Sequence, residues 1–131
     1  MDAETLLFFD GHASALPIFE AFEAMLRDMF PEAGKRVQKT QITYYHRHVF
    51  ACVSFLRVKR KSELPDPYLV ITLGLPEPLA SGRAAVQTEP YPGRWTVHIV
   101  VGRPEEIDEE LTAWVRQAYD FSEKKPGRSG N

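Results

Sequence analysis

The chain has 131 residues, with a single cysteine, little net charge and no long hydrophobic run. One cysteine, Cys52, excludes a disulfide framework. A formal net charge of −2 gives no overall attraction to polyanions. The longest largely apolar run, Val49–Leu56, is far shorter than the ~20 residues that span a bilayer. No secretory signal is recognisable at the start of the sequence. We therefore expect a soluble cytoplasmic protein with no membrane partner.

Motifs that carry well-known chemistry are missing as well. There is no glycine-rich phosphate loop, dinucleotide-binding turn, nucleophile elbow or zinc-protease helix. His46 and His48 are candidate metal ligands with Cys52 four residues further on, but no fourth ligand lies at local spacing, so we expect neither a metal nor a cofactor. Cys52 has apolar neighbours on both sides, which is typical of a small buried residue rather than a nucleophile.

The composition is that of one folded domain. Hydrophobic residues make up 44% of the chain and include eight phenylalanines, which is enough for a core. The length matches a single domain. We expect this domain to span residues 1–123, followed by a polar, flexible tail over residues 124–131.

The small net charge hides a partition along the chain. Residues 1–34 carry seven acidic side chains and one basic, whereas residues 35–61 carry eight basic and no acidic ones. A local basic stretch can bind an anion, but charged runs are usually just solvated. We interpret the cluster at the end of this stretch as a solubilising loop; its members are Arg57, Lys59, Arg60 and Lys61.

Hydrophobic spacing predicts two helices. The first is capped by Ser14, has Pro17 in its first turn and ends near residue 30, and Phe22 and Leu26 belong to its apolar stripe. The second begins at Pro104 and has six residues in its stripe: Ile107, Leu111, Trp114, Val115, Ala118 and Phe121.

Between these helices the period changes to two, which predicts five strands. They cover residues 35–45, 48–58, 68–75, 83–89 and 94–101. Pro92-Gly93 has the composition of a tight turn. Short connections favour an antiparallel meander with both helices on one face. The expected fold class is therefore α+β, a two-layer sandwich.

Strand parity predicts a polar face opposite the helices. The apolar faces would be Leu69 to Leu75, Ala84 to Thr88 and Trp95 to Val101, in alternate residues. A two-residue turn would pair Tyr91 with Arg94, Glu89 with Thr96, and Gln87 with His98. Six residues are the candidate ligand-binding set of the polar face: Lys39, Gln41, Tyr68, Arg83, Arg94 and His98.

Three functional hypotheses remain open beside an ordinary solvated sheet face. The first is a non-enzymatic binding domain for a small anion, a nucleic-acid phosphate or a protein. The second is an enzyme with His98 as acid/base, Glu89 orienting it, and Arg83 or Arg94 stabilising an anion. The third is a module that forms homodimers through an edge strand or the open face.

Segments along nearly the whole chain resemble a bacterial family, the domain of unknown function 5655. The matching segments are Phe9–Gly11, Val37–Ile42, Phe50–Val53, Asp66–Val70, Glu89–Thr96 and Ile107–Leu111. The resemblance implies a compact α+β domain, used alone or at the end of longer proteins. It implies no activity. Its motif positions include Lys39, Gln41, Tyr68, Arg94 and Trp95, and we interpret only the last of these as a core residue.

Overall fold

The computed structural model describes residues 1–124. Three α-helices are present: α1 (Ala3–Phe8), α2 (Leu16–Met29) and α3 (Glu109–Glu123). Six strands form the sheet: β1 (Gly34–Val37), β2 (Gln41–Tyr45), β3 (Val49–Ser54), β4 (Leu69–Leu75), β5 (Ala84–Tyr91) and β6 (Arg94–Val101). Short 3₁₀ turns cover Ala13–Ala15, Lys61–Glu63 and Pro104–Glu106. No helix within residues 1–124 is long and apolar enough to cross a membrane.

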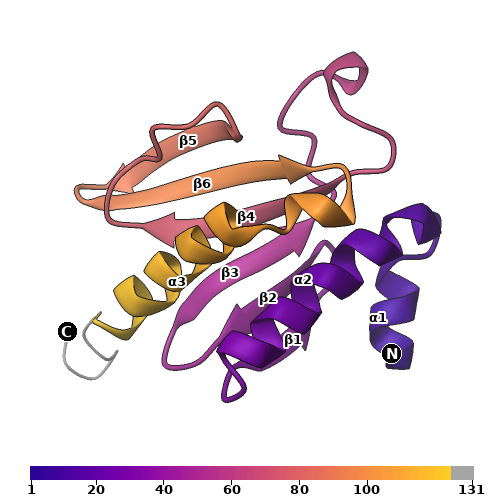
Figure 1. The fold of residues 1–131 in the computed structure, drawn as a ribbon, viewed down its shortest axis with the longest axis horizontal. Coiled ribbons are helices and arrows are strands. Elements are labelled where there is room, and N and C mark those ends of the chain that lie inside the picture. Colours follow the sequence, from indigo (N-terminus) through magenta and orange to yellow (C-terminus); the bar gives the residue numbers. More distant parts are fainter. Residues whose placement is uncertain (125–131) are drawn as a thin grey trace.

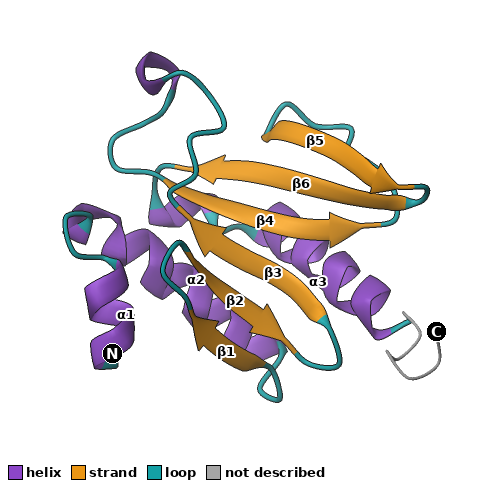
Figure 2. Ribbon diagram, turned by 180° about the vertical axis from the view of Figure 1, so that it is seen from behind, coloured by secondary structure: helices purple, strands orange, loops and turns teal. Residues whose placement is uncertain are grey.

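The molecule has two layers. All neighbouring strands pair antiparallel, in the order β1-β2-β3-β4-β6-β5. Helices α2 and α3 lie across one face of this sheet (Figure 1). The opposite face carries no long helix, and we call it the open face (Figure 2). Helix α1 and the β3–β4 loop (residues 55–68) flank the same end of the sheet (Figure 2). The predicted α+β sandwich with both helices on one face is confirmed.

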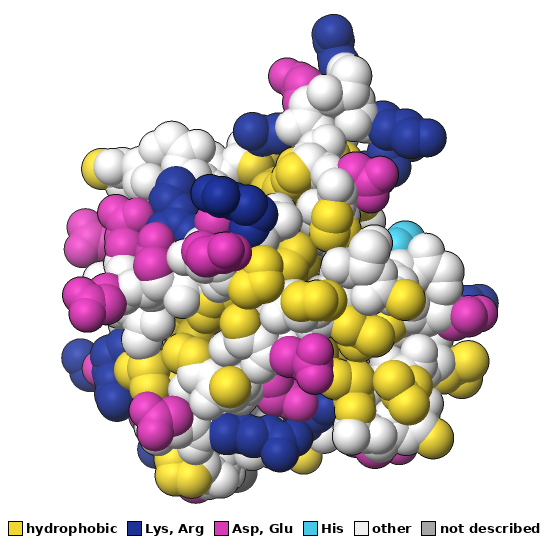
Figure 3. Space-filling view, turned by 45° about the vertical axis from the view of Figure 1, so that its right-hand side comes forward, with side chains coloured by type: hydrophobic (Ala, Val, Ile, Leu, Met, Phe, Trp, Pro, Cys, Tyr) yellow, Lys and Arg dark blue, Asp and Glu magenta, His cyan; other side chains and the backbone are white. Residues whose placement is uncertain are grey.

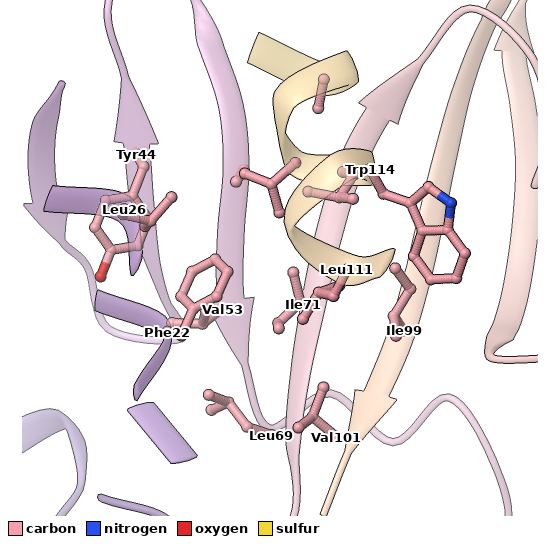
Figure 4. Close-up of a cluster of buried hydrophobic side chains, with 14 of the residues drawn as sticks. Phe22, Leu26, Tyr44, Val53, Leu69, Ile71, Ile99, Val101, Leu111 and Trp114 are labelled. Carbon is pink, nitrogen blue, oxygen red and sulfur yellow. The ribbon is translucent and has the colours of Figure 1, made fainter. Parts of the chain in front are cut away.

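The core lies between the sheet and the two long helices. Alternate residues of β4 and β6, such as Ile71 and Ile99, are fully buried and face Leu111 and Trp114 of α3 (Figure 4). On the other side, Phe22 of α2 packs against the neighbouring strands (Figure 4). Burial of this kind contributes ~25 cal/mol per Å² of apolar surface, so the alternation fixes which face of each strand points inward.

Local sequence signals explain only part of where the two long helices begin. Asp108 caps α3, because its side chain accepts a hydrogen bond from the Leu111 amide at 3.0 Å. Pro17 lies in the first turn of α2, as predicted. Ser14 does not cap α2, because a 3₁₀ turn precedes the helix and Ala15 occupies the cap position without a side-chain hydrogen bond. Pro104 likewise opens a 3₁₀ turn rather than α3 itself.

The predicted count of five strands is wrong, because the first one is folded back on itself. Residues 35–45 form two strands, β1 and β2, joined by a turn in which the Gln38 amide donates to the Gln41 carbonyl at 2.9 Å. Neither glycine nor proline occurs in this turn, so the sequence does not predict it.

The strand order also departs from a meander. Strand β6 lies between β4 and β5, whereas a meander would place β5 next to β4. The connection over residues 76–83 is long enough to carry the chain past one strand position. Strand β6 is the more apolar of the two and occupies the central position, while β5 forms the edge. The expected tail over 124–131 lies, from residue 125 onward, outside the described residues.

One charged group lies within the core layer. Glu23 of α2 is only 9% exposed, and its Oε2 accepts a hydrogen bond from the Tyr44 hydroxyl at 3.0 Å and lies 2.8 Å from Lys35 Nζ. Its Oε1 accepts from Arg27 at 3.1 Å. Burial and the neighbouring carboxylate raise the pKa of Tyr44, so this hydroxyl stays a donor. The network joins α2 to β1 and β2.

Tyr44→Phe should lower the free energy of unfolding by ~1–3 kcal/mol, because the buried carboxylate of Glu23 would lose a hydrogen-bond donor. Urea denaturation followed by circular dichroism measures this. The matched control is Tyr45→Phe, since Tyr45 is the next residue of β2 and its ring stacks under Arg36 instead. The control should change stability by less than ~0.5 kcal/mol. Equal losses in both variants would contradict the role assigned to Glu23.

Candidate functional site

A row of polar side chains crosses the middle of the open face. Thr43, Cys52, Thr72 and His98 are register partners on the adjacent strands β2, β3, β4 and β6. The row forms because partner residues of antiparallel strands point to the same side of a sheet. His98 Nδ1 and Thr72 Oγ1 lie 2.8 Å apart and form a hydrogen bond. One ring nitrogen of His98, Nε2, is left for another partner.

Burial shifts the pKa values of the two titratable groups of this row, His98 and Cys52. Burial lowers the pKa of His98 below its ordinary value of 6.5, so the imidazole is neutral at pH 7. Burial raises the pKa of the Cys52 thiol, and a hydrogen bond with Thr72 opposes this more weakly. Cys52 is therefore a protonated thiol at neutral pH and a poor nucleophile, as its apolar neighbours predict.

Cys52, Thr72 and His98 of this row form part of the floor of a cavity of about 580 Å³, which we call the open-face groove. Its walls come from the end of α1, the β1–β2 turn and the start of the β3–β4 loop. The lining residues from these three walls are Phe8, Asp10, His12, Lys39, Thr40, Gln41, Phe55, Leu56 and Arg57. Ligand sites in proteins are commonly concave and mostly apolar, with a few polar groups that converge.

Aromatic rings build one wall of the groove. The ring of Phe55 stacks on His12 with centroids 3.9 Å apart, and on Phe8 with centroids 5.5 Å apart. The Tyr68 hydroxyl donates a hydrogen bond to the Phe55 carbonyl at 2.7 Å and so holds the backbone of Phe55 in place. The wall thus joins the segment after α1 to the start of the β3–β4 loop.

A second cavity of about 400 Å³, the loop cavity, shares His12 and Arg57 with the groove. It lies between the turn at Gly11 and the β3–β4 loop, and Lys61 and Tyr68 also line it. The loop projects from the body of the molecule and carries several basic side chains (Figure 3). Arg57 and Lys61 therefore border cavities, while the solubilising role of this cluster stays a prediction.

Positive charge exceeds negative charge around the groove. Lys39 and Arg57 line it, whereas Asp10 is the one carboxylate among its described lining residues. Both cations are exposed, so solvent weakens their field but leaves their side chains free to move toward a ligand. The arrangement suits an anion.

The structure brings together three of the six predicted binding residues. Lys39, Gln41 and His98 all line the open-face groove. Tyr68 lines the adjoining loop cavity. The amide of Gln41 donates to Thr43 at 3.0 Å, which orients it along the row of polar side chains.

Arg83 does not share this face, so that part of the prediction is wrong. Its Nη1 donates to Asp108 and to Glu110, each at 3.0 Å, and its guanidinium lies over the Trp114 ring. Arg83 thus packs against the start of α3, on the helix side of the sheet. The acidic first turn of α3 provides the partners that the strand pattern cannot reveal.

Arg94 and Glu89 also lie outside the groove. Arg94 packs over Phe121 at the end of α3. Glu89 accepts a hydrogen bond from the Gly93 amide at 3.0 Å and so stabilises the β5–β6 turn. The proposed catalytic set of His98, Glu89 and an arginine is therefore not assembled.

A bulge in β5 explains the error in strand parity. Ala84 pairs with Ile99, but Val86 pairs with His98, so two steps on β5 match one step on β6. Val86 and Thr88 therefore lie on the open-face side, where we expected Gln87 and Glu89. Gln87 instead exchanges two hydrogen bonds with the backbone of Leu79, at 2.7 and 3.0 Å. The predicted pairing of Tyr91 with Arg94 is confirmed.

The two histidines considered as metal ligands, His46 and His48, have different surroundings. His46 Nδ1 lies 2.8 Å from Glu123 Oε1, at the end of α3. The Nε2 of His48 is buried and has no hydrogen-bond partner among the described residues. Within residues 1–124, no group of three or more His, Cys, Asp or Glu side chains is placed to hold a metal.

Sequence reasoning missed the residues that enclose the groove: Phe8, His12, Phe55 and Arg57. The chain turns at Gly11, which has a positive φ of 81°. Nothing in the local sequence shows which strand this turn approaches.

The family described as Domain of unknown function (DUF5655) matches residues 6–122, which is most of the chain. The chain belongs to this family. Comparisons with curated proteins and with solved structures gave no match. The description of this family names no activity or ligand. The groove is therefore the basis for the function proposed below.

The lowered pKa of His98 predicts a pH dependence of stability. The unfolded state takes up this proton near pH 6.5 and the folded state only at lower pH, so stability should fall as the pH drops below 6.5. His98→Gln should remove that part of the dependence. NMR titration of the imidazole gives the folded pKa, and thermal unfolding gives the stability at each pH. A His98 pKa above 6.5 would contradict the assignment.

Proposed function

We propose that this domain binds a small anion that carries an aromatic or apolar group, and that it does so in the open-face groove. The supporting observation is the convergence of Lys39 and Arg57 with the Phe8–Phe55 wall over the floor at His98. The groove offers a charge partner, an apolar surface and a polar end, which together define a mixed ligand.

The anionic part belongs beside Arg57. An arginine binds carboxylate or phosphate through two parallel N–H donors, and Lys39 adds a second charge from the β1–β2 turn. Both side chains are exposed, which favours moderate affinity with marked salt dependence. The Nε2 of neutral His98 supplies a hydrogen bond without adding charge.

The apolar part belongs against the aromatic wall. Phe55 and Phe8 present stacked rings whose faces and edges suit a second ring, and Leu56 extends the apolar surface. A groove with this wall discriminates against a bare inorganic anion, because such an ion leaves the apolar surface in water.

A small molecule suits the groove better than the other binding partners. A nucleic-acid site needs a longer track of cations than the groove provides, and the net charge is −2. A protein partner needs ~800 Å² of surface on each side, which a cavity between α1 and a loop does not offer. Formation of homodimers stays a prediction that sedimentation at increasing concentration tests.

The test uses three probes of graded chemistry. Phenyl phosphate has both ring and charge, inorganic phosphate has only the charge, and benzyl alcohol has only the ring. Titrations followed by amide chemical shifts should place phenyl phosphate in the groove, with saturable shifts at His98 and Phe55 and weaker binding of the other two. Saturable shifts confined to the tip of the β3–β4 loop, or none at all, would contradict the proposal.

Arg57→Ala should weaken phenyl phosphate binding by about tenfold, because a charge-assisted hydrogen bond contributes ~1.5–3 kcal/mol and 1.4 kcal/mol is tenfold. The matched control is Arg60→Ala, which removes the same charge from the same loop. Arg60 lines neither the groove nor the loop cavity. If the control weakened binding equally, the effect would come from the general field of the loop and a specific site would be excluded. A single-stranded oligonucleotide that binds more tightly than phenyl phosphate, and loses affinity in both variants, would favour nucleic acid instead.

A further inference from the structure

A separate small cavity lies at the opposite end of the sheet from the open-face groove. It sits where β3 and β6 begin, where β4 ends and where α3 finishes, and its volume is about 180 Å³. We call it the Arg94 pocket. Gly74, Tyr91, Arg94, Trp95 and Phe121 are among the residues that line it. Of its lining residues within 1–124, none is acidic and Arg94 is the one cation.

The guanidinium of Arg94 is held in place but incompletely bonded. Its central carbon lies 5.6 Å from the centroid of the Phe121 ring. Its Nη1 is buried and has no hydrogen-bond partner among the described residues. Buried donors are nearly always paired in folded proteins, and a charged donor without a partner is particularly costly. Because Arg94 also lines the pocket, this unpaired donor points to a ligand.

Arg83 provides an internal comparison. It too lies over an aromatic ring, 5.4 Å from the centroid of Trp114. Its Nη1, however, donates to two carboxylates, and its Nη2 donates to the Glu106 carbonyl at 2.7 Å. The same type of packing thus comes with acidic partners at Arg83, and Arg94 Nη1 lacks the equivalent partner.

We infer that the Arg94 pocket binds a carboxylate attached to a small apolar or aromatic group. The carboxylate would accept from Arg94, and the attached group would pack among Tyr91, Trp95 and Phe121. One arginine in a cavity of this size suits a singly charged carboxylate better than a phosphate, whose second charge would find no further cation among the described lining residues. This site is independent of the groove and of the function proposed for it.

Gly74 is an exposed part of the pocket lining. A Cβ built at this position would meet no atom within 4 Å, so a side chain there would occupy free space without a collision. Because Gly74 lines the pocket, Gly74→Val should fill part of it while leaving the charge of Arg94 unchanged. Valine also suits a strand, so this change tests occupancy of the pocket with little risk to the fold.

Benzoate is the probe for a free acid. We expect saturable shifts of the Trp95 indole N–H and of the Arg94 Nε–H, with a Kd on the order of 10 mM, the range that ligand efficiency gives for about nine non-hydrogen atoms. Arg94→Gln should abolish these shifts, Arg94→Lys should weaken binding severalfold, and Gly74→Val should block it. The matched control is Arg36→Gln, which removes an arginine stacked on Tyr45 of the same sheet and should leave binding unchanged.

A peptide C-terminus is the second source of the same chemistry. A tripeptide ending in phenylalanine should produce the same shifts with a free C-terminus and none when amidated. Tighter binding of the peptide than of benzoate would assign the site to chain ends, and the reverse would assign it to free acids. Benzoate shifts that persist in both Arg94→Gln and Gly74→Val, or no saturable shift by either probe, would overturn the inference. If Arg94→Gln does not fold, Gly74→Val decides alone.

Discussion

Burial of one face of the sheet against α2 and α3 is the interaction on which the rest of the structure depends. It requires that alternate residues of β4 and β6 be apolar and close-packed, as Ile71 and Ile99 are. The residues between them are then forced to the open face, where Thr72 and His98 meet. The polar row follows directly from the constraint that builds the core.

The groove adds a second requirement, since a flat sheet face has no cavity. Helix α1 and the β3–β4 loop supply the missing walls, and the stack of His12 on Phe55 joins them. The segments that make the groove thus lie at the margin of the sheet, away from the Glu23 network that joins α2 to β1 and β2. None of Glu23, Tyr44 and Lys35 lines the groove, so this network can be altered without changing the groove lining.

The sequence predicts the layers of this fold because periodicity reports burial. The stripe of Leu111, Trp114 and Val115 and the alternation in β4 both describe contact with one core. It does not predict the turn at Gln38–Thr40 or the central position of β6, because neither depends on a local pattern. The site was predicted only in part for the same reason. Lys39, Gln41 and His98 follow from parity, whereas the bulge in β5 and the acidic partners of Arg83 are tertiary features.

The proposed anion site lies in the groove and uses its aromatic wall. A crystal structure of the domain grown with phenyl phosphate is the sharpest test. We expect the phosphate beside Arg57 and the phenyl ring against Phe55, with His98 within hydrogen-bond distance of the ligand. Phenyl phosphate bound only at the tip of the β3–β4 loop, with the groove empty, would contradict it.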